Sequence, residues 1–138
     1  QHLQNSLNRA KFLLAFSTSV SPAPYTHPTK EYITGRWTDA LASGVTVVGK
    51  VPNTTTVREI LWDGATIDID HADARAGLAQ VADAVSRWTP AQGEQQIRQA
   101  LQHLDWRHRF VQLCEAMGEV PASLQADCEA MRAQYVQR

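Results

Sequence analysis

Five residues between positions 31 and 39 carry groups that suit the binding of an anion flanked by hydroxyl groups. Two acids, Glu31 and Asp39, are separated by seven residues, and Thr34, Gly35 and Arg36 lie between them. Ionised carboxylates only accept hydrogen bonds, so their natural partners are hydroxyl groups. The Thr34 hydroxyl, the Arg36 guanidinium and the backbone N–H groups of a helix start all donate, which suits a phosphate. The pattern therefore indicates a binding site with an anion at its centre.

A helix is predicted to carry this group of residues. It starts at about Tyr32 or Thr34 and runs to Ser43, and Gly44 stands where a left-handed C-terminal cap is expected. Apolar residues recur at helical spacing and predict its core face: Ile33, Trp37, Ala40 and Leu41. Eight residues of helix rise about 12 Å. This is about the separation of two sugar rings joined through a diphosphate, with one acid for each sugar.

The same charges also have a purely structural interpretation. Glu31 near a helix N-terminus can simply favour the helix dipole. Arg36 and Asp39 can form a solvated helix face. Spacing by itself leaves the binding interpretation and the structural one open.

Three apolar segments predict the sheet that positions this helix. Residues 11–17 form a continuous apolar run, which predicts a strand buried on both faces, and residues 45–49 and 65–70 predict two more strands. The alternation of strands with helices predicts a Rossmann-like parallel sheet, small or incomplete with only three strands. A long Pro-rich loop, residues 18–30, precedes the helix. In open α/β sheets ligands bind at the carboxyl ends of the strands, where this loop lies.

The rest of the chain is predicted to be helical. A helix opens at His71 or Asp73 and runs to about Trp88, with a core face of Leu78, Val81, Ala82 and Val85. Thr89-Pro90 and Asp105 start two further helices, Gly118 ends the second, and a last helix reaches about Tyr135. We therefore expect one domain or fragment, with an α/β core at residues 1–70 and a helical tail at residues 71–138.

Composition narrows the classes of partner. The chain of 138 residues has a net charge of −1, which gives no electrostatic reason to expect nucleic-acid binding. No apolar run approaches the roughly 20 residues of a transmembrane helix. Cys114 and Cys128 match neither a zinc motif nor a disulfide framework, which favours free thiols and no metal site. We expect a cytoplasmic protein, or one at the membrane periphery. Because residue 1 is Gln, we also expect a piece of a longer protein.

The stretch from Glu31 to Gly49 matches the motif region of a known family. Glu31, seven intervening residues and Asp39 are followed by Ala-Leu-Ala-Ser-Gly44 and Val-Thr-Val-Val48. This order resembles the E-x7-E region of GT-B glycosyltransferases, whose second acid leads into Ala-x-Ala-x-Gly and a Val-rich strand. The similarity extends over about residues 10–115, through Thr56-Val-Arg-Glu-Ile60, Gly64, Asp70 and His103-Leu-Asp-Trp106.

The resemblance implies the donor-binding domain of a metal-independent glycosyltransferase. The family's first acid contacts the donor sugar, so Glu31 becomes the catalytic candidate. Its second acid holds the ribose hydroxyls, a role for Asp39, and its helix start faces the diphosphate, a role for residues 34–36. The resemblance implies a nucleotide-diphosphate sugar as substrate and no cofactor. A sugar or other acceptor would be held by a separate N-terminal domain, so the chain alone is expected to be inactive.

The chain also departs from the family. Its second acid is Asp, one methylene shorter than Glu, and Thr34-Gly35-Arg36 replaces an apolar-rich connector. Two rival functions follow: a non-catalytic α/β protein-interaction domain, and a phosphate-binding domain without sugar chemistry. Convergence of Glu31, Arg36 and Asp39 on one cleft would favour the enzyme. Salt bridges on a closed surface would favour the interaction domain. An exposed apolar stripe in the tail, at Ile97–Met131, would indicate that the tail packs on a partner domain.

Overall fold

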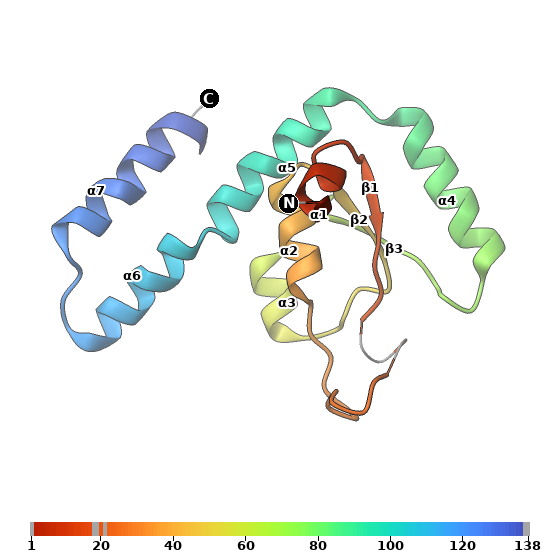
Figure 1. Cartoon of the computed structure of the whole chain (residues 1–138), viewed down its shortest axis with the longest axis horizontal. Helices are drawn as coiled ribbons and strands as arrows, with labels where there is room; N and C mark the ends of the chain where they lie inside the picture. The colour runs from red at the N-terminus through yellow and green to blue at the C-terminus, as the bar shows by residue number, and fades with distance from the viewer. Residues whose placement is uncertain (1, 18–19, 21, 137–138) are drawn as a thin grey trace. The chain divides into compact units, whose positions relative to one another are not determined.

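The computed structural model describes residues 2–17, 20 and 22–136, and Figure 1 labels its helices and strands. The chain forms two compact units, Gln1–Ile97 and Arg98–Arg138. The first unit contains a sheet of three parallel strands in the order β1-β2-β3: β1 (Phe12–Leu14), β2 (Thr46–Gly49) and β3 (Thr66–Asp68). Leu13 pairs with Val47, and Val48 pairs with Ile67. The prediction of an α/β fold with a small parallel sheet is confirmed.

Helices of the first unit follow the local signals in the sequence. They are α1 (His2–Leu7), α2 (Gly35–Ala42), α3 (Thr55–Ile60), α4 (Ala74–Arg87) and the start of α5 (Pro90–His103). Asp73 caps α4 by accepting a hydrogen bond from the backbone N–H of Ala76 at 2.9 Å. Pro90 is the first residue of α5, as its fixed φ and missing N–H predict.

Helix α2 is the best-buried helix of the unit and packs on β2. Its side chains Trp37, Ala40 and Leu41 are fully buried, as the helical spacing predicted, whereas Ile33 precedes the helix and is half-buried. Gly44 follows the C-cap residue Ser43, and its φ of 82° places it in the left-handed region where glycine is favoured. All four residues of β2 are buried, so α2 and β2 form the centre of the core.

A buried glutamine connects α5 to the sheet. Gln96 donates to the Thr46 hydroxyl at 3.1 Å and to the Gly64 carbonyl at 2.6 Å. Its carbonyl oxygen accepts a hydrogen bond from the Trp62 indole at 2.8 Å. A buried amide is tolerated because its polar groups are paired. These bonds hold α5, at Gln96, against Thr46 of β2 and against Gly64 in the turn before β3.

The carboxyl end of β2 requires glycine. A Cβ at Gly49 would lie 1.8 Å from the carbonyl oxygen of Ala15, the residue that follows β1. The same segment is held by a hydrogen bond of 2.9 Å from the Ala15 N–H to the Val48 carbonyl. Gly49 therefore allows the backbones of β1 and β2 to approach closely at the edge where ligands bind in such sheets.

Two burial predictions are wrong. Residues 11–17 were expected to be buried on both faces, but Leu14 is 64% exposed, whereas Ala15 and Ser17 on the other face are buried. The predicted core face of α4 is also open, since Leu78 is 71% exposed and Val85 is half exposed. The physical reason is the same in both cases. An apolar stripe becomes core only where another element covers it, and none of the described residues of this unit covers these side chains fully.

The second unit contains α6 (Trp106–Met117), α7 (Ala122–Met131) and a final π-helical turn (Arg132–Val136). Asp105 caps α6 by accepting from the Arg107 N–H at 2.9 Å, and Gly118 ends it with φ of 94°. Asp105 also binds the Arg107 guanidinium at 2.7 and 2.8 Å. This hydrogen-bonded pair lowers the pKa of Asp105 and raises the pKa of Arg107. Both signals predicted for this helix, the aspartate start and the glycine end, are confirmed.

Cys114 is half-buried and Cys128 is buried, and both are free thiols. Within residues 2–17, 20 and 22–136, no helix has the length and apolar character needed to cross a membrane.

Candidate functional site

A hollow of about 380 Å³ lies beside the predicted acid Glu31. One wall comes from the segment that leads from β1 to α2, and the other from the segment that leads from β2 to α3. Its lining residues are Thr29, Lys30, Glu31, Tyr32, Asn53 and Thr54. Both segments follow parallel strands, and ligands bind in such folds at the carboxyl ends of the strands. The hollow is therefore in the part of the fold where a ligand is expected.

Glu31 is held in place by a residue just beyond β1. Its carboxylate Oε1 accepts a hydrogen bond of 2.6 Å from the hydroxyl of Ser17, which is itself buried. The Glu31 side chain is half-buried. A buried hydroxyl therefore orients this carboxylate, which can present its acceptor oxygens to a ligand hydroxyl in the hollow.

A histidine orders the chain that precedes Glu31. The His27 Nδ1 accepts hydrogen bonds from the backbone N–H groups of Thr29, at 3.2 Å, and Lys30, at 3.1 Å. These bonds close a tight turn in a segment that is otherwise irregular. His27 therefore acts as a positioning residue for Lys30 and Glu31 and does not line the hollow itself.

The start of α2 comes three residues after Glu31 and suits an anion. Thr34 is the N-cap residue with extended backbone, yet its hydroxyl makes no capping hydrogen bond. The Thr34 carbonyl accepts from the Trp37 N–H at 2.9 Å. The N–H groups of Gly35 and Arg36, which precede Trp37, have no carbonyl partner within the helix, and the first turn of α2 contains no acid. The dipole and these N–H groups therefore favour a negatively charged group here.

Gly35, Arg36 and Asp39 share the solvent-facing side of α2, opposite the buried Trp37 and Ala40. Asp39 lies one turn beyond Gly35, about 6 Å along the helix. Across the described part of the chain, the side chains of Arg36 and Asp39 form no ion pair and no hydrogen bond, and the Ser43 hydroxyl donates only to the Asp39 backbone carbonyl, at 2.8 Å. The salt-bridged closed surface that would favour a structural role is thus not what these two side chains form.

The structure brings only one of the five predicted residues into the hollow. Glu31 lines it, whereas Thr34, Gly35, Arg36 and Asp39 follow it along the exposed side of α2. Among the described residues, Arg36 and Asp39 do not line this hollow, so the hollow does not bring Glu31, Arg36 and Asp39 together. The arrangement is a hollow that holds the first acid, followed by a helix start and a second acid on an open surface.

Sequence reasoning missed the opposite wall of the hollow. The Asn53 Oδ1 accepts from the Arg58 guanidinium at 2.5 Å, which leaves the Asn53 amide N–H groups to donate to a ligand. Thr54 caps α3 by accepting from the Val57 N–H at 3.2 Å. Lys30 adds a cation next to Glu31. The available signal was positional: residues 51–54 directly follow a buried strand, at the end where ligands bind.

Among the residues that the structure describes, no group of three or more His, Cys, Asp or Glu side chains is placed to hold a metal ion. Comparison with known proteins gives no match to this chain among protein-family models, curated proteins or solved structures. The function is therefore inferred from the chain's own residues and geometry.

Proposed function

We propose that the chain is the donor-binding part of a glycosyltransferase of the GT-B type, which holds a nucleotide-diphosphate sugar at the carboxyl edge of its parallel sheet. One observation carries the proposal. Glu31 is the oriented, half-buried acid of a hollow at this edge, and the uncapped start of α2 follows it directly. A sugar hydroxyl and a diphosphate lie next to each other in such a donor, and these two features are their matching partners.

Each candidate residue has a role in this proposal. Glu31 accepts hydrogen bonds from the donor sugar and is the catalytic candidate. Thr34, Gly35 and Arg36 supply a hydroxyl, backbone N–H groups and a guanidinium to the diphosphate. Asp39 accepts from the ribose hydroxyls one helical turn further on. The acceptor is bound elsewhere, so the chain binds the donor without transferring the sugar.

Lys30 and Asn53 extend the proposed site across the hollow. Lys30 places an ammonium group beside Glu31, where it can approach a phosphate oxygen. Asn53 faces them from the segment after β2 and can donate to a sugar or phosphate oxygen. Lys30 and Asn53 thus add hydrogen-bond donors to a hollow whose acceptor is Glu31. A sugar phosphate requires both, because its phosphate oxygens accept hydrogen bonds and its hydroxyl groups donate them.

Isothermal calorimetry with UDP, GDP and their sugars tests this proposal. We expect heat with at least one nucleotide and its sugar. Arg36→Ala is expected to weaken that binding by about tenfold or more, the value of one lost charge-assisted hydrogen bond. Arg75→Ala is the matched control, because Arg75 is an exposed arginine in the first turn of α4. Absence of heat with every nucleotide would refute the proposal.

A second candidate function is supported by an exposed stripe on α6. Trp106, Phe110, Leu113 and Met117 recur at helical spacing, and Trp106 and Met117 are 73% and 77% exposed. A stripe of large apolar side chains in water is typical of a protein interface. This observation favours a non-catalytic interaction domain, which predicts no heat in the same calorimetry.

A further inference from the structure

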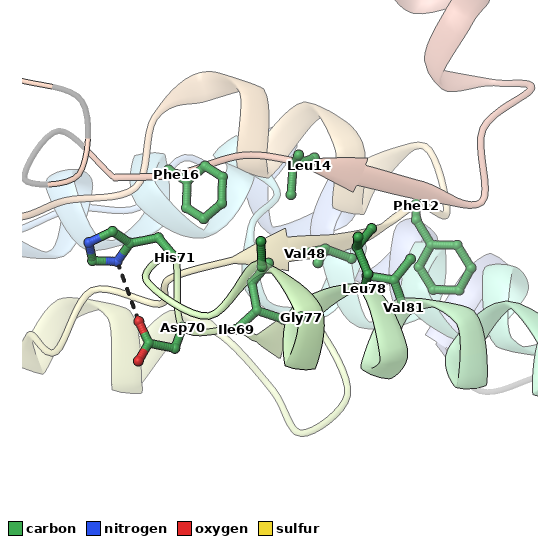
Figure 2. Close-up of a pocket in the computed structure, with 11 residues that line it drawn as sticks. Phe12, Leu14, Phe16, Val48, Ile69, Asp70, His71, Gly77, Leu78 and Val81 are labelled. Atoms are coloured by element: carbon green, nitrogen blue, oxygen red, sulfur yellow. Dashed lines mark ion pairs between the residues drawn. The ribbon is translucent and has the colours of Figure 1, made fainter.

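An apolar groove of about 420 Å³ lies between one face of the sheet and α4 (Figure 2). Phe12, Leu14 and Phe16 are alternate residues of β1 and its extension, so they point to the same face. Leu78 and Val81 of α4 face them across the groove. The volume is within the range of about 300–1,000 Å³ that small-molecule sites occupy. The groove and the hollow at Glu31 share no lining residue.

The groove exists because α4 approaches the sheet closely at one point. A Cβ at Gly77 would lie 3.5 Å from the Cδ1 of Ile69, which is ordinary van der Waals contact. Elsewhere the helix leaves space, and Leu14 and Leu78 remain largely in solvent. Parallel sheets normally have both faces covered. An apolar ligand that filled the space would bury surface that now meets water.

One end of the groove is polar. Asp70 and His71 lie beside Phe16, at the end opposite Phe12 (Figure 2). The Asp70 Oδ1 accepts from the Ala72 N–H at 2.9 Å and lies 3.9 Å from the His71 Nδ1. Asp70 is the only acid among the described residues that line the groove, and no Lys or Arg side chain lines it. The groove thus combines an apolar body with a single anionic end.

We propose that this groove binds an amphiphilic ligand with an apolar body and a terminal ammonium group. The body lies along the sheet face between Leu14 and Leu78, and the ammonium donates to the Asp70 carboxylate. A carboxylate head would be repelled by Asp70, and an alcohol would gain no charge pairing. This proposal does not depend on the proposed donor site.

NMR titration of the whole chain with octylammonium, 1-octanol and octanoate tests the proposal, because the three probes share one tail and differ in the head. We expect each probe that binds to shift the amide signals of Ile69 and Gly77. Octylammonium should bind about two- to fivefold more tightly than octanol, the range for an exposed ion pair. Octanoate should bind most weakly.

Single substitutions distinguish the contribution of the probe's alkyl tail to binding from that of its head group. Leu14→Ser and Leu78→Ser should weaken all three probes by about five- to tenfold, because each removes apolar contact area. Both side chains are largely exposed, so the fold tolerates the changes. Leu3→Ser, at an exposed leucine of α1 outside the groove, should change nothing. Asp70→Asn should abolish the preference for octylammonium and leave octanol binding unchanged.

Four results would overturn the proposal. The first is no shift at Ile69 and Gly77 with any probe. The second is equal affinity for the three heads, and the third is a preference for octylammonium that survives Asp70→Asn. The fourth is a self-associated wild-type chain that Leu14→Ser converts to a monomer in sedimentation, because the groove would then be covered by a second copy.

Discussion

Two glycine-to-alanine substitutions should change stability in opposite directions, because the structure gives the added methyl group different neighbours. At Gly77 the nearest heavy atoms to a Cβ are side-chain atoms of Ile69 at 3.5–4.0 Å. The methyl therefore fits. Alanine is favoured over glycine inside a helix by about 0.8–1.0 kcal/mol. We expect Gly77→Ala to raise the free energy of unfolding of the first unit by about 1 kcal/mol.

At Gly49 the same methyl group meets backbone. The Ala15 carbonyl oxygen is 1.8 Å from the Cβ position, and its carbonyl carbon is 2.8 Å away. These atoms belong to a strand extension that is hydrogen-bonded to Val48, so no side-chain rotation can relieve the clash. Overpacking typically costs about 1–3 kcal/mol and a lost backbone hydrogen bond about 1 kcal/mol. We expect Gly49→Ala to lower the free energy of unfolding by about 2–4 kcal/mol.

Urea unfolding followed by tryptophan fluorescence measures both changes by linear extrapolation. Trp106 belongs to the second unit and is exposed, so a Trp106→Phe background leaves Trp37, Trp62 and Trp88 to report on the first unit. The two variants should differ by about 3–5 kcal/mol. A Gly49→Ala variant as stable as the parent would refute the close approach of β1 and β2. Marked destabilisation by Gly77→Ala would refute the van der Waals spacing between Gly77 and Ile69.

Two further predictions concern polar groups that stabilise elements within each unit. Gln96→Ala removes three hydrogen bonds and should lower the free energy of unfolding of the first unit by about 2–3 kcal/mol, whereas the exposed Gln80→Ala should change it by less than about 0.5 kcal/mol. Both are measured by the same urea titration, and equal effects would contradict the buried network. The hydrogen bond from Arg107 lowers the pKa of Asp105 below its ordinary value of 3.8. The ionised Asp105 therefore stabilises α6 fully above pH 3.8, and this stabilisation is lost as the pH falls through the lowered pKa. In NMR spectra recorded against pH, the amide signals of α6 should change in acid for the parent chain and for the control Glu119→Gln, but not for Asp105→Asn. The same acid-dependent change in Asp105→Asn would contradict the pairing of Asp105 with Arg107.

The parts of the fold that the sequence predicted are those fixed by local chemistry. The left-handed Gly44, the proline at the start of α5 and the aspartate cap of α6 each act on neighbouring backbone, so nearby residues suffice to predict them. The parallel sheet followed from short buried strands separated by helices, because that order requires crossover connections. Such signals need no knowledge of distant residues.

Burial could not be predicted in the same way. The stripe of α4 and the run of β1 are apolar, but periodicity shows only that a face is apolar and does not identify what covers it. The contacts at the candidate site could not be predicted from the sequence for the same reason. The Ser17–Glu31 hydrogen bond joins residues 14 positions apart, and Asn53 faces Glu31 across the hollow from another loop. Both depend on how irregular segments return to the sheet, which has no periodic signal in the sequence.

The most direct test of the proposed donor site compares a nucleotide-diphosphate sugar with its nucleotide alone, by calorimetry on the Glu31→Gln variant. Glutamine keeps one oxygen that can accept from Ser17, removes the negative charge and replaces the second acceptor oxygen with a donor NH2 group. We predict that affinity for the nucleotide sugar falls by about tenfold or more while affinity for the nucleotide is unchanged. Glu94→Gln, an exposed change on α5, should affect neither. Equal loss for both ligands, or no loss for either, would contradict the assignment of Glu31 to the donor sugar.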